Sequence, residues 1–156
     1  MCVIKRRSAF RATGVNQSLP ANNTVKVNFP NQQFDLANEY DAATSTFIPA
    51  IDGVYIIQAT ITFQTNFNDR NLNFFARANI RLNGNFVKGV DTGYRLAANL
   101  VGNQNLPNTV TVSTIVQLEA GDRVDVTAIS STAVNITPEI SVEDNIEATY
   151  FTAARL

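Results

Sequence analysis

The sequence predicts an all-β protein folded as one antiparallel β-sandwich or jelly roll. Short segments with strand-type alternation follow one another along the chain, and turns rich in Gly, Asn and Pro separate them. No segment carries a sustained apolar stripe at helical spacing. A length of 156 residues indicates a single domain with enough chain to bury a substantial core.

Each expected strand is recognised by the alternation of apolar and polar side chains, which is typical of a half-buried strand. The alternating segments are residues 25–29, 80–82, 110–116 and 124–128, followed by a closing strand at roughly 146–153. Asn83-Gly84 is a strong signal for a hairpin turn, and residues 119–122 predict a second turn.

Residues 53–63 form the longest expected strand, and both of its faces begin with apolar side chains. Val54 and Ile56 begin one face, although an antiparallel sheet usually presents one polar face to water. Tyr150 and Phe151 are likewise neighbours that point to opposite faces. We expect one face to pack the core and the other to pack a second subunit, with a covering loop as the alternative. The core and interface positions expected from this pattern are Tyr55, Ile57, Ala59, Ile61, Phe63, Tyr150 and Phe151.

The composition argues against several classes of function. The sequence has no histidine, which excludes Ser-His-Asp and Cys-His catalysis and every metal site that uses histidine ligands. Twelve basic and thirteen acidic residues give a net charge of −1, so nothing predicts a clustered basic face for nucleic acid. Lys5-Arg6-Arg7 is the only basic run and is expected to be a solvated tail. We therefore expect a protein that is not an enzyme.

The sequence also predicts no insertion into a membrane. No apolar run reaches the roughly 20 residues that a membrane span needs, and residues 1–7 lack the apolar stretch of a secretory signal. Cys2, the one cysteine, cannot form a disulfide within the chain. The expectation is a free terminal thiol, with a bridge between two chains as the alternative.

Six residues in one stretch of the chain stand at the spacings that mark a known family. They are Phe29, Asp35, Tyr40, Phe47, Gly53 and Tyr55. With this pattern the chain resembles the C1q domain of the complement C1q and tumour necrosis factor superfamily. Residues 80–84, 116–124 and 146–151 are similar to hairpins and to the final strand of that family, so the resemblance covers nearly the whole chain. The last two signature positions hold Ile57 and Ala59 in place of aromatic residues.

The resemblance implies a ten-stranded jelly roll over residues 9–156, preceded by an N-terminal tail of residues 1–8. It implies assembly as a homotrimer, in which the strand of Tyr55, the strand 111–118 and the two terminal strands line the trimer axis. The function that it implies is a non-enzymatic recognition or structural module. Such a module binds a protein or glycan ligand through its loops or at subunit clefts.

Some features look more like a bacterial or phage member of the family than an animal one. These are the single cysteine, the absence of a collagen stalk and the Asn-rich loops. Such members resemble the caps of spore-surface filaments or the tips of virion fibres. The expected location is therefore extracellular or on a surface, such as a spore coat, an exosporium or a virion, without a recognisable signal peptide.

Two segments expected to be loops carry the candidate ligand contacts, because binding residues concentrate on loops. The candidates are Arg70 in residues 67–73, and Asp91, Tyr94 and Arg95 in residues 88–104. A monomeric jelly-roll carbohydrate-binding module is the alternative function. That alternative requires a groove lined with Trp or Tyr, and the sequence has no Trp and four Tyr.

An acidic stretch near the end of the chain offers the hard oxygen ligands that calcium prefers. It contains Glu139, Glu143, Asp144 and Glu147, and some members of the family hold calcium near the trimer axis. The spacing matches no fixed calcium loop, so a solvated acidic rim is the expected role. Glu143 and Asp144 are the calcium candidates, and no other cofactor is expected.

Other polar residues are expected to have structural roles. Asp35 and Tyr40 should stabilise a local loop through hydrogen bonds. Gly53 should mark a close approach that leaves no room for a side chain. Asp122 should close the turn after Gly121. Asp122 and Asp125 are three positions apart along a strand, so their side chains should point to opposite faces, which argues against an acid–base pair.

Overall fold

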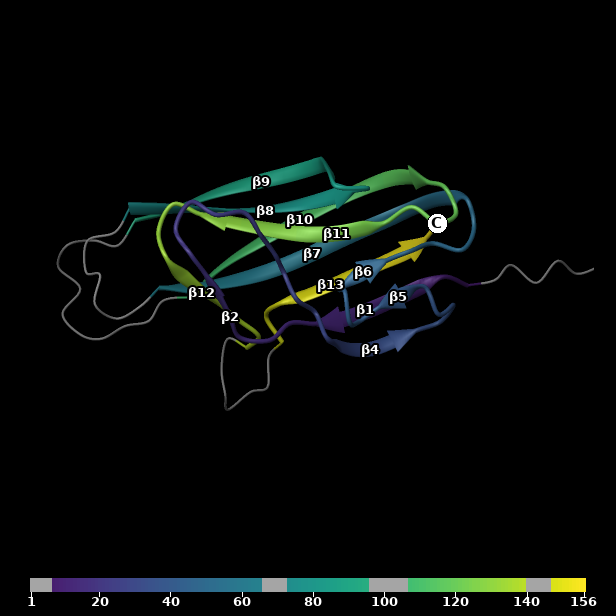
Figure 1. Cartoon of the computed structure of the whole chain (residues 1–156), viewed down its shortest axis with the longest axis horizontal. Coiled ribbons are helices and arrows are strands. Elements are labelled where there is room, and N and C mark those ends of the chain that lie inside the picture. Colours follow the sequence, from purple (N-terminus) through teal and green to yellow (C-terminus); the bar gives the residue numbers. More distant parts are fainter. Residues whose placement is uncertain (1–6, 66–72, 96–106, 140–146) are drawn as a thin grey trace, which may run out of the picture.

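A computed structural model shows two antiparallel β-sheets that pack face to face as a sandwich (Figure 1). The structure describes residues 7–65, 73–95, 107–139 and 147–156. These residues contain no helix, and so none that is long and apolar enough to cross a membrane. The all-β sandwich predicted from alternation and turn chemistry is confirmed.

Sheet A is organised around its long central strand, β7 (Gly53–Thr65). One side of β7 pairs with β10 along almost its whole length, and the other side pairs first with β13 and then with β12. The sheet continues from β13 to β1 and β4, while β2 lies beside β12. The bounds of these strands are β1 (Ala9–Thr13), β2 (Gln17–Leu19), β4 (Asn31–Asp35), β10 (Pro107–Leu118), β12 (Val134–Thr137) and β13 (Tyr150–Arg155).

Sheet B has the strand order β5-β6-β11-β8-β9, and β3 also pairs with β11. Its strands are β3 (Val25–Lys26), β5 (Tyr40–Asp41), β6 (Thr46–Phe47), β8 (Asn73–Leu82), β9 (Asn85–Arg95) and β11 (Val124–Ser130). The described residues thus hold thirteen strand segments where ten were expected. Four of them, β2, β3, β5 and β6, have only two or three residues. Residues with positive φ at Asn22, Asn38 and Ser45 interrupt this part of the chain.

The core between the sheets contains one complete face of β7. Tyr55, Ile57, Ala59, Ile61 and Phe63 are all 0% exposed, as is Phe151 on the neighbouring β13. Tyr150 lies on the opposite face of β13 and is only half-buried. The residues expected at the core or interface therefore divide between two faces, and six of the seven belong to the core.

An aromatic cluster forms one end of this core, and most of the signature residues belong to it. The ring of Phe10 stacks on Tyr40 at 4.3 Å and on Phe47 at 5.1 Å between centroids, and meets the edge of Phe151 at 4.9 Å. Phe47 in turn meets Tyr55 at 5.7 Å. Each such pair contributes about 0.5–1.5 kcal/mol beyond the burial of its area.

The loop before Tyr40 is held by Asp35, as the sequence predicts. The Asp35 carboxylate accepts hydrogen bonds from the backbone amides of Tyr40 at 2.8 Å and Ala37 at 3.3 Å. The Tyr40 hydroxyl donates to the carbonyl of Phe29 at 2.8 Å. Burial raises the pKa of Tyr40 to about 12, since the phenolate would be desolvated.

The glycine of the signature marks a close approach, again as predicted. A Cβ atom added to Gly53 would lie 2.7 Å from Nε of Arg155. At the neighbouring turn Asp122 accepts a hydrogen bond from the amide of Glu119 at 2.8 Å, which closes the turn. Asp125 instead lies on sheet B, where Arg81 donates two hydrogen bonds to it at 2.7 Å.

Ser8, immediately before β1, is packed against the C-terminal end of the chain. Ser8 is 7% exposed, its hydroxyl donates to the carboxylate of Glu39, and its carbonyl accepts from the amide of Arg155 at 3.0 Å. The start of β1 and the C-terminus therefore lie side by side at one end of the sandwich (Figure 1).

Candidate functional site

The outward face of sheet A is apolar at the end where β7 begins. Val54 is 44% exposed, Ile115 is 63% exposed and Leu156 is 69% exposed. Ile56 lies directly opposite both Ile115 on β10 and Ala154 on β13, and cross-strand partners share a face. We call these five residues the apolar patch. They are the outward counterparts of the buried Tyr55 face.

The remainder of this outward face is polar and ordered by hydrogen bonds. Hydroxyl pairs join β7 to β10, with Thr60 and Thr111 at 3.0 Å and Thr62 and Thr109 at 2.9 Å. The amide of Gln58 donates to the hydroxyl of Tyr150 at 3.1 Å. The face is thus divided along β7 into an apolar end and a hydroxyl-rich end.

The exposed edges of the two sheets differ in how they are protected. A register shift places Gln33 of β4 as an extra residue opposite β1, and a second shift does the same for Val87 of β9. Such bulges discourage further strand pairing. By contrast β10 pairs with β7 in twelve consecutive positions without a shift, and no described strand pairs with its other edge.

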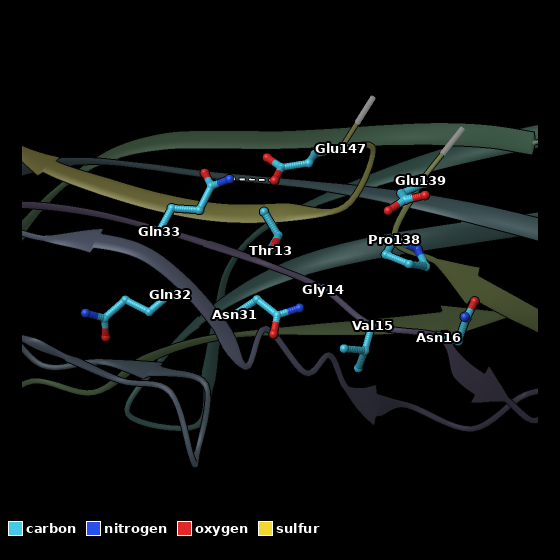
Figure 2. A pocket seen from close by; sticks show the side chains of 10 residues that line it. All are labelled: Thr13, Gly14, Val15, Asn16, Asn31, Gln32, Gln33, Pro138, Glu139 and Glu147. Carbon is cyan, nitrogen blue, oxygen red and sulfur yellow. Dashed lines mark hydrogen bonds between the residues drawn. The ribbon is translucent and has the colours of Figure 1, made fainter. Parts of the chain in front are cut away.

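A polar cavity of about 450 Å³ opens beside the edge strand β4 of sheet A, where β1 ends (Figure 2). Gly14 and Val15 follow β1 and line it together with Thr13 and Pro138. Six polar side chains complete the lining: Asn16, Asn31, Gln32, Gln33, Glu139 and Glu147. Glu139 and Glu147 are paired across an isolated antiparallel bridge. Among the described residues that line it, none has an aromatic ring or a basic side chain.

One wall of the cavity is fixed by a chain of side-chain contacts. Gln33 donates to Glu147 at 2.5 Å (Figure 2). Arg11 in turn donates to Gln33 at 2.8 Å. The Arg11 guanidinium lies 3.8 Å from the second oxygen of Glu147 and 4.0 Å from the centre of the Tyr150 ring. The bulge in β4 allows this arrangement, because it inserts Gln33 opposite β1 beside Arg11.

Comparison with known proteins supports the fold. No protein-family model and no curated protein matches the chain. A solved structure of the tumour necrosis factor Eiger from S. frugiperda matches with a TM-score of 0.65. The match covers 97% of this chain and 94% of that one, at 12% sequence identity. The chain has a TNF-like fold. At this identity the likeness describes the architecture alone.

The prediction of a ligand-binding loop at residues 88–104 is partly wrong, because residues 88–95 belong to a strand of this TNF-like fold. Asp91, Tyr94 and Arg95 belong to β9 and pair with β8 up to the last residue of the strand. Gly89 and Gly93 interrupt the alternation of side chains in this strand, and because glycine is typical of turns the sequence resembles a loop. At Gly89 the missing side chain makes room for Asn79 of β8, which would collide with a Cβ atom there.

The other candidate ligand residues are only partly placed by the structure. Arg70 and the calcium candidates Glu143 and Asp144 lie outside the described residues. Within the described ranges, no group of three or more His, Cys, Asp or Glu side chains is arranged to hold a metal ion. Glu139 and Glu147 do come together, at the mouth of the polar cavity. The carbohydrate-binding alternative requires an aromatic lining, and none of the described residues that line this cavity is aromatic.

Sequence reasoning missed Gln33 and its partner Arg11. Gln33 and Glu147 are 114 positions apart in the sequence, so no local motif joins them. The available signal was the run Asn31-Gln32-Gln33, three carboxamides in a chain poor in charged residues.

Proposed function

We propose that the chain is a non-enzymatic recognition or structural module that works as a homotrimer, with the apolar patch as part of the subunit interface. The observation that carries the proposal is the exposure of Val54, Ile115 and Leu156 beside one another on a sheet face. Burying this area against a sister copy stabilises an assembly by about 25 cal/mol per Å² of apolar surface. The resemblance to a trimeric superfamily supports three copies.

The unprotected edge of β10 also supports an assembly. The edges at β4 and β9 carry bulges, whereas the longer edge at β10 carries none. Natural sheets protect an edge by a bulge, by charge or by covering it. The side chains of β10 carry no charge, and β10 already lies close to β9 of sheet B, so a second copy need cover only the rest of this edge.

We further propose that the module is displayed on a surface, such as a spore, a cell or a virion fibre, and binds a protein or glycan there. The support for this location is the resemblance to stalkless bacterial and phage members. A test is to label the source organism with an antibody raised against the folded chain. Labelling confined to the interior of intact cells and particles would remove the surface role.

The interface is tested best with residues that leave the core intact. Tyr55→Asp is unsuitable, because Tyr55 is 0% exposed and the variant would report on folding. Ile115→Asp changes a side chain that is 63% exposed. We expect this variant to keep the circular dichroism spectrum of the parent and to elute as a single chain of 17.1 kDa.

A matched control places the same charge on the other sheet. Phe75 is 46% exposed on β8 of sheet B, and Phe75→Asp should leave the mass of the assembly unchanged. If Ile115→Asp retains the parent mass, the apolar patch is not the interface.

A further inference from the structure

The polar cavity beside β1 and β4 has a lining that restricts what it can bind. Its volume of about 450 Å³ lies within the range of roughly 300–1,000 Å³ that is typical of ligand pockets. Of the described residues in the lining, Val15 and Pro138 alone have apolar side chains, so an apolar ligand would find little surface to bury. Glu139 repels anions and has no ion pair within the described residues, whereas the charge of Glu147 is offset by Arg11 at 3.8 Å.

The carboxamide and carboxylate side chains of the lining are suited to a ligand with many hydroxyl groups. A carboxamide offers both donors and acceptors, and a carboxylate offers acceptors only. A hydroxyl group can donate and accept, so it matches both kinds of side chain. The side chains of Asn31, Gln32 and Glu139 make no hydrogen bond within the described residues, which leaves these groups available to a ligand.

Another part of the lining is already ordered. Gln33 is held between Arg11 and Glu147, and Arg11 rests on the ring of Tyr150. A side chain that is held before binding loses little conformational entropy when the ligand arrives. Gly14 also belongs to the lining, and its amide is held by the carbonyl of Thr149 at 2.9 Å.

We propose that this cavity is a binding site for a neutral saccharide, which it recognises through hydroxyl groups. The mode differs from that of an aromatic-lined groove, because no ring in the lining stacks on the sugar. Binding to one cavity is weak, in the millimolar range, because hydrogen bonds exchange with water at little net gain. The site belongs to a single chain and does not depend on the trimer.

The test is a titration of the isotope-labelled full chain, followed by nuclear magnetic resonance. The probes are glucose, galactose, mannose and N-acetylglucosamine, with galacturonic acid as an anionic counterpart of galactose. At least one neutral sugar should shift the backbone signals of Gly14 and of residues 31–33. Galacturonic acid should bind more weakly than galactose, because Glu139 repels its carboxylate.

Two variants separate the cavity from nonspecific effects. Gln33→Leu removes the ordered carboxamide and should weaken binding of the sugar by roughly tenfold, the effect of one lost hydrogen bond. Gln117→Leu makes the same change at an exposed site on β10 and should bind as the parent does. Should Gln33→Leu fail to fold, Gln32→Leu takes its place, since Gln32 is exposed and its side chain makes no hydrogen bond within the described residues.

The proposal is overturned if no neutral sugar shifts these signals, or if Gln33→Leu and Gln117→Leu bind equally. It is also overturned if calcium chloride alone produces the shifts and no sugar does, because the cavity is then a cation site. The mass of each sample is measured in parallel. A single chain that still binds the sugar refutes the trimer and leaves the cavity intact.

Discussion

At the scale of single residues, two buried threonines differ in what their hydroxyl groups do. Thr149 accepts from the amide of Thr62 at 3.0 Å and donates to the carbonyl of Thr137 at 2.6 Å. Thr127 is 1% exposed, and its hydroxyl has no hydrogen-bond partner among the described residues. A buried polar group without a partner costs about 1–3 kcal/mol in desolvation.

Replacing each threonine by the isosteric valine should therefore give opposite results. Thr127→Val should leave the free energy of unfolding unchanged or raise it by about 1 kcal/mol. Thr149→Val should lower it by about 1–3 kcal/mol, because two backbone groups lose their partner. Urea denaturation measures both values. Equal destabilisation by the two substitutions would show that the Thr127 hydroxyl is bonded in solution.

Tyr40 should make the stability fall in alkaline solution. Its pKa is raised from 10.0 to about 12 in the folded protein, so the unfolded chain loses the proton first as the pH rises. The contribution of Tyr40 to the free energy of unfolding is fully present below pH 10 and is lost between pH 10 and about 12. The loss amounts to about 2–3 kcal/mol, at 1.36 kcal/mol for each pKa unit. Unfolding measured across this window should show a steeper decline for the parent than for Tyr40→Phe. Parallel declines would contradict the assigned pKa.

At the scale of elements, Gly14 fixes how the end of β1 meets the start of β13. Its amide donates to the carbonyl of Thr149 at 2.9 Å, and an added Cβ would lie 2.6 Å from Cγ2 of Thr149. Thr149 cannot move aside without breaking its own hydrogen bonds. Gly14→Ala should therefore cost about 1–3 kcal/mol of unfolding free energy.

Gly53→Ala is the matched control for this substitution. There the nearest atom is Nε of Arg155, near the end of a flexible side chain that can shift. The control should lose less stability than Gly14→Ala in the same denaturation experiment. The reverse order would mean that the junction of β1 and β13 is more adaptable than its contacts indicate.

The elements that the sequence predicts are those with one buried face. β7, β10 and β11 alternate between core and outward positions, so apolar periodicity locates them. β4 lacks any buried residue, and its polar sequence therefore carries no periodic signal. The glycines of β9 hide a strand in a similar way, because a glycine there accommodates Asn79.

The candidate sites differ in the same way: one is recognised from residues close together in the sequence, and the other is formed by residues far apart in it. The outward apolar residues Val54 and Ile56 are neighbours of the core positions, so the pattern of one strand reveals them. The cavity joins residues from both ends of the chain, and the contact between Gln33 and Glu147 spans 114 positions. Tertiary folding alone brings these groups together.

At the scale of the whole molecule, one face of sheet A is buried in the core, and the other face exposes apolar side chains. The core is filled by the inward side of β7, and the opposite side presents the apolar patch to solvent in a single chain. Strand β10 contributes Ile115 to this patch opposite Ile56 of β7, and no described strand pairs with its other edge. Both features are accounted for if sister copies cover this part of sheet A.

The mass of the parent chain in solution tests this account most directly. Light scattering coupled to size-exclusion chromatography, at low micromolar concentration, should give three times 17.1 kDa. A folded species of 17.1 kDa at that concentration would mean that the outward face of sheet A is stable in water, which contradicts the assembly.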